Sequence, residues 1–93
     1  MIRVLVVDDH PVVRTGLEAL LRSEPGFVCV GTVPTRDACP HVRRTHPDVV
    51  LGTRGPLVSG EGYATIIDDA HDLPGLFNRL RLAVRDDEQE ATA

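Results

Sequence analysis

The sequence contains no tryptophan and no lysine, and aromatic residues make up only 3 % of its 93 residues. Because 42 % of the residues are nevertheless hydrophobic, we expect a core built from Val, Leu, Ile and Ala. The apolar run that follows Met1 is too short, and too soon followed by acidic residues, for a signal peptide or a membrane span. These absences predict one cytoplasmic globular domain without membrane contact.

Basic residues are also scarce. Ten arginines oppose fourteen acidic residues, and the resulting net charge of −4 argues against a surface that binds nucleic acid directly. Cys29 and Cys39 lack CxxC spacing, so we expect both thiols to be reduced and to hold no metal. Much of the acidity lies in RDDEQEATA, and we expect residues 85–93 to form a disordered acidic tail.

Strand and helix patterns alternate through the first half of the chain. The run IRVLVV is typical of a strand that is buried on both faces of a parallel sheet, and leucines at helical spacing follow it. Pro40 fits a helix only near its start, which favours Asp37 as the N-cap of the second helix. Strands are predicted at residues 2–7, 27–31, 48–51 and 63–67, and helices at residues 11–22, 38–45 and 73–84.

The order strand, helix, strand, helix, strand predicts an open, doubly wound parallel sheet, because crossovers between parallel strands are right-handed. Binding sites in such sheets lie beyond the carboxyl ends of the strands. Asp8 and Asp9 directly follow the first strand, so they are the leading candidate site residues.

Three stretches carry a family resemblance: the first strand, DDHP and leucine-spaced helix in residues 2–31, HPDVVL in residues 46–51, and PLVSGE in residues 56–61. They resemble the receiver domain of bacterial response regulators, most of all the branch whose output is a LuxR-type DNA-binding domain. The resemblance implies a flavodoxin-like (CheY-like) fold in residues 1–84, incomplete at its C-terminal side, with about four strands and three helices.

Receivers use such an acidic pair to hold Mg²⁺ beside a phosphoacceptor carboxylate at the end of the third strand, so the resemblance implies a metal-binding role for Asp8 and Asp9. The phosphoacceptor position falls on Thr53, or on Gly52 if the alignment shifts by one residue, and neither is acidic. Asp48 lies at the opposite end of that strand, roughly 15 Å away. The pair is therefore expected to be a weak, vestigial Mg²⁺ site.

Two further departures concern the rest of the family's site. The lysine that completes it has no counterpart in a chain without lysine, and Asp69 takes the place of the family's Thr or Ser. A structural alternative for Asp9 is that it caps the first helix and interacts with the positive end of the helix dipole.

These features lead to one functional hypothesis and one alternative. The first is an atypical pseudo-receiver of a two-component or transcriptional regulatory system, which is no enzyme and acts by protein–protein contact that is independent of phosphorylation. The alternative is a small-molecule sensor whose ligand occupies the emptied acidic site beside the neutral rim of Gly52, Thr53 and Gly55. A residual phosphoacceptor role of Thr53 or Asp69 is a weaker third possibility.

A complete receiver has a fifth strand and further helices, for which this chain has no sequence. We therefore expect the first helix to lack a neighbour, and the chain to form a homodimer by exchange of its last helix or by face-to-face packing. The residues expected in the contact are Leu17, Leu20, Leu21, Leu76, Leu80 and Val84.

Overall fold

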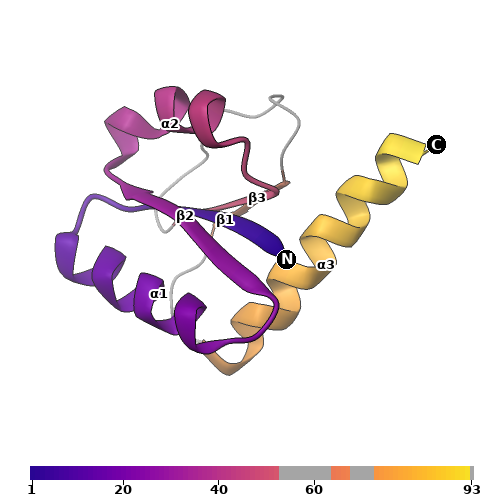
Figure 1. The fold of residues 1–93 in the computed structure, drawn as a ribbon, viewed down its shortest axis with the longest axis horizontal. Helices are drawn as coiled ribbons and strands as arrows, with labels where there is room; N and C mark the ends of the chain where they lie inside the picture. Colours follow the sequence, from indigo (N-terminus) through magenta and orange to yellow (C-terminus); the bar gives the residue numbers. More distant parts are fainter. Residues whose placement is uncertain (53–63, 68–72, 93) are drawn as a thin grey trace.

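The computed structural model describes residues 1–52, 64–67 and 73–92. One parallel sheet has the strand order β2-β1-β3-β4, and helices cover both of its faces (Figure 1). The doubly wound arrangement predicted from the sequence is confirmed. In chain order the elements are β1 (Ile2–Val7), α1 (Pro11–Ser23), β2 (Phe27–Val33), the 3₁₀ helix η1 (Thr35–Asp37), α2 (Ala38–Thr45), β3 (Val49–Gly52), β4 (Ala64–Ile67) and α3 (Leu73–Thr92).

The central strand β1 is buried on both faces. Val4 and Val6 pack in the cluster that contains residues of α1 and α3, whereas Leu5 and Val7 pack in the cluster that contains residues of α2. All four side chains are at most 1 % exposed. A strand covered in this way has no polar face, which explains why its last four residues are all apolar.

Helix α3 lies on the same face of the sheet as α1 (Figure 1). Leu76 and Leu80 are almost fully buried, and they belong to the same cluster as Leu17 and Leu21 of α1. The expectation that α1 lacks a neighbour is therefore wrong, because α3 of the same chain supplies one. Docking within one chain buries these leucines without the entropic cost of bringing two chains together.

This packing changes the meaning of the six residues expected at a dimer contact. Four of them, Leu17, Leu21, Leu76 and Leu80, form part of the core of a single chain, and Leu20 and Val84 are partly buried against that core. A face-to-face contact through the four buried leucines is incompatible with the docked α3. An exchange of α3 between two chains would preserve the same contacts.

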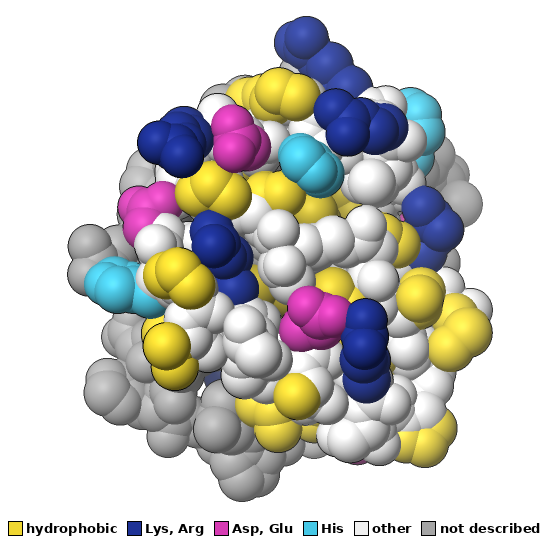
Figure 2. All heavy atoms as spheres, turned by 60° about the vertical axis from the view of Figure 1, so that its left-hand side comes forward, with side chains coloured by type: hydrophobic (Ala, Val, Ile, Leu, Met, Phe, Trp, Pro, Cys, Tyr) yellow, Lys and Arg dark blue, Asp and Glu magenta, His cyan; other side chains and the backbone are white. Residues whose placement is uncertain are grey.

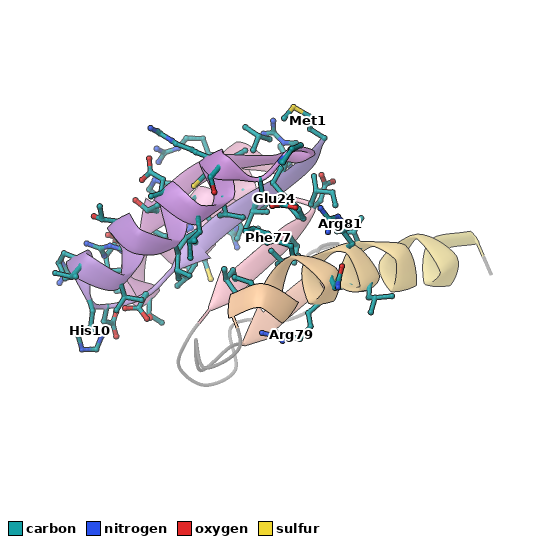
Figure 3. All side chains as sticks on the ribbon, turned by 90° about the horizontal axis from the view of Figure 1, so that it is seen from below. Met1, His10, Glu24, Phe77, Arg79 and Arg81 are labelled. Atoms are coloured by element: carbon teal, nitrogen blue, oxygen red, sulfur yellow. The ribbon has the colours of Figure 1, made fainter. Side chains whose placement is uncertain are left out.

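A group of four side chains, which we call the α3 clamp, joins α3 to the start of β2. The rings of Phe27 and Phe77 have centroids 5.3 Å apart, and the guanidinium carbon of Arg81 lies 5.0 Å from the centroid of the Phe27 ring. Arg81 also forms an ion pair of 3.0 Å with Glu24. Figure 3 shows Glu24, Phe77 and Arg81 together at this junction, with His10 at the far end of α1.

The C-terminal segment differs from the prediction. Helix α3 continues to Thr92, so the expectation of a disordered tail is wrong for residues 85–92. Extending an existing helix needs no new nucleation, and Glu, Gln and Ala are favourable helix residues. Within the described residues, no helix is both long enough and apolar enough to cross a lipid bilayer.

The local boundaries follow the sequence signals closely. Helix α1 begins at Pro11, where a missing N–H group costs nothing, and Pro40 lies in the first turn of α2. Asp37 occupies the N-cap position of α2, but its side chain makes no capping hydrogen bond. Strand β2 is two residues longer than predicted, and its pairing with β1 contains a register shift at Val4/Leu5 that accommodates an extra residue.

Candidate functional site

The acidic pair lies where it was expected, at the carboxyl end of β1, but its two members differ in environment. Asp8 is only 3 % exposed. Its Oδ1 atom accepts a hydrogen bond of 2.6 Å from the backbone N–H of His10 and lies 3.3 Å from the Nδ1 atom of the same residue. The carboxylate of Asp8 thus folds back on the turn that leads into α1.

Asp9 is exposed and faces a different element. Its Oδ1 atom accepts a hydrogen bond of 3.0 Å from the backbone N–H of Thr35, the first residue of η1. Asp9 is therefore not the N-cap residue of α1, and its Oδ1 atom binds an N–H group 26 residues away. The N-cap residue of α1 is His10, whose side chain makes no capping hydrogen bond.

The end of β3 carries no acid within the described residues. Gly52 is the last residue of β3, is buried, and pairs with Val7, the residue before Asp8. The other residues discussed from the sequence at this rim, namely Thr53, Gly55 and Asp69, lie outside the described residues.

Asp48 has a structural role at the opposite, amino end of the parallel strands. Its Oδ2 atom accepts a hydrogen bond of 2.9 Å from the backbone N–H of Arg3, and its own N–H group donates one of 2.9 Å to the carbonyl oxygen of Arg3. The prediction that Asp48 lies at the amino end of β3 is confirmed. Its carboxylate cannot approach a group at the carboxyl end of the strands.

The acidic pair supplies few ligands for a divalent cation. One oxygen atom of each carboxylate of the pair already accepts backbone N–H groups. Within the described parts of the chain, no three acidic, histidine or cysteine side chains gather in a group that could hold a metal ion. A tight Mg²⁺ site commonly combines carboxylates with substrate oxygens and water, so the described residues fit at most a partial site.

Neither cysteine lies next to the acidic pair in the sequence or is hydrogen-bonded to it by any contact described above. Cys29 lies on β2 and Cys39 lies in the first turn of α2, as predicted, and both are free thiols. Burial raises the pKa of the Cys29 thiol, which makes the nucleophilic thiolate form scarcer at neutral pH.

Arginine side chains, which sequence reasoning did not single out, lie beside the acidic pair. Arg14 donates a hydrogen bond of 3.0 Å from its guanidinium group to the carbonyl oxygen of Asp8. Together with Arg36 it lines an open cleft between the loop after β1 and the start of η1. No motif marks either arginine, and their positions became evident only from the fold.

Two substitutions of Asp8 should separate the effect of its hydrogen bond on stability from the effect of its charge. Asp8→Ala should lower the free energy of unfolding by about 1–3 kcal/mol, because it leaves the His10 N–H group without its acceptor in a part-buried position. Asp8→Asn keeps an acceptor oxygen and removes a negative charge beside Asp9, so it should preserve or raise stability. Urea unfolding of both variants checks this, and equal losses would contradict it.

Comparison with known proteins identifies relatives, although no family model matches the chain. The chain is 37 % identical to a protein-glutamate methylesterase/protein-glutamine glutaminase from Hydrogenovibrio crunogenus over 75 residues. This alignment covers 78 % of the chain and 20 % of that relative. Over 52 residues the chain is 46 % identical to the response regulator GacA from Pseudomonas aeruginosa, which covers 55 % of this chain and 24 % of that relative.

A third relative is the transcriptional regulatory protein BtsR from Salmonella typhi, with 34 % identity over 73 residues, 76 % of this chain and 30 % of that relative. The chain thus spans between about a fifth and a third of the length of these relatives. Two of the three are named as regulators, and the sheet order and the acidic edge agree with the resemblance seen in the sequence. The chain is a receiver-like domain of the response regulator family.

Proposed function

We propose that this receiver-like domain acts in the cytoplasm, within a two-component or transcriptional regulatory system, as an atypical receiver that works through protein contact and without phosphoryl transfer. The observation that carries the proposal is the end of β3, where a buried glycine, Gly52, pairs with Val7, the last residue of β1 before the acidic pair. The absence of lysine from the whole chain supports it further.

Two local features support protein contact as the mode of action. Val12 is 84 % exposed at the start of α1, and it lines a shallow apolar groove together with Pro11, Thr15 and Gly16. An exposed apolar side chain on a helix next to the acidic edge gives a partner a surface to recognise. In this proposal the domain is not an enzyme, and it does not bind nucleic acid itself.

Phosphorylation is expected to be absent. Incubation of the full chain with acetyl phosphate and Mg²⁺, followed by intact-mass measurement, should show no gain of one phosphoryl mass. In parallel, calorimetry should give Mg²⁺ affinity in the millimolar range or weaker, because within the described parts of the chain no third acidic, histidine or cysteine side chain joins the pair. A phosphoryl adduct lost in Thr53→Ala or Asp69→Asn, or micromolar Mg²⁺ binding lost in Asp9→Ala, would refute the proposal.

We further propose that a homodimer forms by exchange of α3, because the exchanged helix would keep its contacts with Leu17 and Leu21. Sedimentation equilibrium should then show a dimer. Because dissociation of this dimer requires α3 to leave the sheet, the midpoint of unfolding should rise with protein concentration. A monomer that persists at about 100 μM, with unfolding independent of concentration, would exclude this dimer.

A further inference from the structure

A cleft lies near the acidic pair, between the loop after β1 and the start of η1, and has a volume of about 690 Å³. Small-molecule sites commonly enclose roughly 300–1,000 Å³. The cleft lies on the β2 side of β1, whereas Gly52, which belongs to the neutral rim considered from the sequence, ends β3 on the other side of β1. Its lining residues are Asp9, Pro11, Arg14, Pro34, Thr35 and Arg36.

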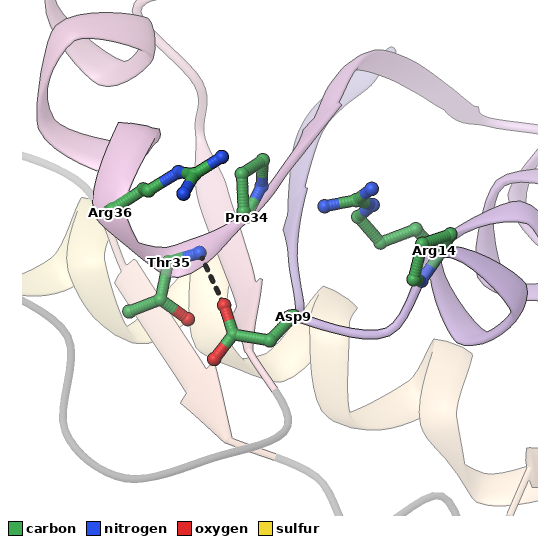
Figure 4. Close-up of a pocket in the computed structure, with 6 residues that line it drawn as sticks. Asp9, Arg14, Pro34, Thr35 and Arg36 are labelled. Atoms are coloured by element: carbon green, nitrogen blue, oxygen red, sulfur yellow. Dashed lines mark hydrogen bonds between the residues drawn. The ribbon is translucent and has the colours of Figure 1, made fainter.

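Two guanidinium groups belong to this cleft. Arg14 comes from α1 and Arg36 from η1, and their side chains extend toward each other on either side of Pro34 (Figure 4). The bond from Arg14 to the carbonyl oxygen of Asp8 uses one of its five N–H donors and fixes the side chain. Arg36 has no hydrogen-bond or ion-pair partner among the described residues.

The residues that line the cleft carry a net positive charge, although the chain as a whole is acidic. Two arginines line it against one carboxylate, that of Asp9, which already accepts the N–H group of Thr35. Asp8 contributes no surface to the cleft, since it is buried and bonded to His10.

The acidity of the chain lies elsewhere. Residues 1–52 carry six arginines and six acidic residues, so the net charge of −4 comes from residues 53–93. Figure 2 shows basic and acidic side chains interspersed over one face of the molecule. A negatively charged ligand therefore meets little repulsion from this part of the chain.

We propose that this cleft binds a small molecule through a phosphate monoester group, held noncovalently between Arg14 and Arg36. A planar guanidinium group pairs with phosphate oxygens through two parallel hydrogen bonds, and a dianion matches two arginines in charge. Pro11 and Pro34 give the cleft stiff apolar walls against which the rest of the ligand can pack. The acidic pair, which suggested a cation site from the sequence, thus borders an anion site.

The test is an NMR titration of the full chain with inorganic phosphate and with glycerol 3-phosphate, at constant ionic strength. We expect saturable shifts of the backbone amides of Arg14, Thr35 and Arg36. Arg14→Gln and Arg36→Gln should each weaken binding at least about tenfold, because each removes a charge-assisted contact. Arg43→Gln, an equal change of charge on the exposed face of α2, should leave the affinity unchanged.

Absence of saturable shifts with both probes would overturn the inference, and so would equal weakening by Arg43→Gln, which would indicate nonspecific attraction. Arg14 also contacts the backbone of Asp8, so the exposed Arg36 carries the test if Arg14→Gln fails to fold. Neither probe can donate a phosphoryl group to the protein, so a parallel incubation with acetyl phosphate and Mg²⁺, measured by intact mass, separates this inference from the proposed function. A covalent phosphoryl adduct would refute the proposed function, which excludes phosphoryl transfer. The NMR shifts would still decide whether the cleft binds phosphate noncovalently.

Discussion

Leu80→Ala is expected to lower the free energy of unfolding by about 3 kcal/mol, within the range of roughly 2–5 kcal/mol for a buried leucine. Leu80 is 0 % exposed and packs in the cluster that joins α3 to α1 and the sheet. The substitution removes apolar contacts and leaves a cavity between two helices and β1. Since small domains are stable by only about 5–15 kcal/mol, this loss removes a substantial part of the total stability, and the midpoint of urea unfolding should fall accordingly.

Leu82→Ala is the matched control, because it makes the same change two residues away on a side chain that is 55 % exposed. It should change the free energy of unfolding by no more than about 0.5 kcal/mol. Urea denaturation followed by circular dichroism measures both variants. Equal effects of the two substitutions would show that α3 does not dock on the sheet in solution.

Phe27→Ala should cost about 3–4 kcal/mol, because the ring is 4 % exposed and lies at the centre of the α3 clamp. The loss combines the buried area of the ring with its contact to Phe77 and to the guanidinium group of Arg81. Phe27→Leu, which keeps most of the apolar volume, should cost clearly less. Thermal and urea unfolding of both variants provide the measurement.

A double-mutant cycle with Arg81→Gln isolates the contact between the cation and the ring. We expect a coupling free energy of about 0.5–1 kcal/mol between positions 27 and 81, because Arg81 remains partly exposed. The ion pair with Glu24 should contribute little, since both of its side chains are accessible to solvent. Additive effects of Phe27→Ala and Arg81→Gln would mean that the ring and the cation do not interact.

The strands and helices of the first 52 residues could be predicted because their signals are local. The nearly continuous apolar run of β1 and the leucine spacing of α1 each lie within a dozen residues, and right-handed crossovers then place the connecting helices on the faces of a parallel sheet. The place of α3 could not be predicted in this way. It depends on Leu76 and Leu80 meeting Leu17 and Leu21, and the family layout suggested that nothing would cover α1.

The site was predictable in position and not in orientation. The sequence placed Asp8 and Asp9 at the carboxyl edge of the sheet, but it could not show which group each carboxylate would bind. Asp9 bonds to Thr35 across 26 residues, and Asp8 bonds to its near neighbour His10. Arg14 and Arg36 carried no signal, because single arginines in a helix and at a helix start are common on solvent-exposed surfaces.

The packing of α3 beside α1 has a consequence for how the chain acquires its structure. One hydrophobic face of the sheet is completed by Leu76 and Leu80, which are synthesised well after β1 and α1. High contact order of this kind slows folding, because a long loop must close before the contacts that reward it exist. A nascent chain that ends at residue 52 would expose Val4, Val6 and Leu51 to solvent. Exposed hydrophobic surfaces of this kind bind chaperones or cause aggregation.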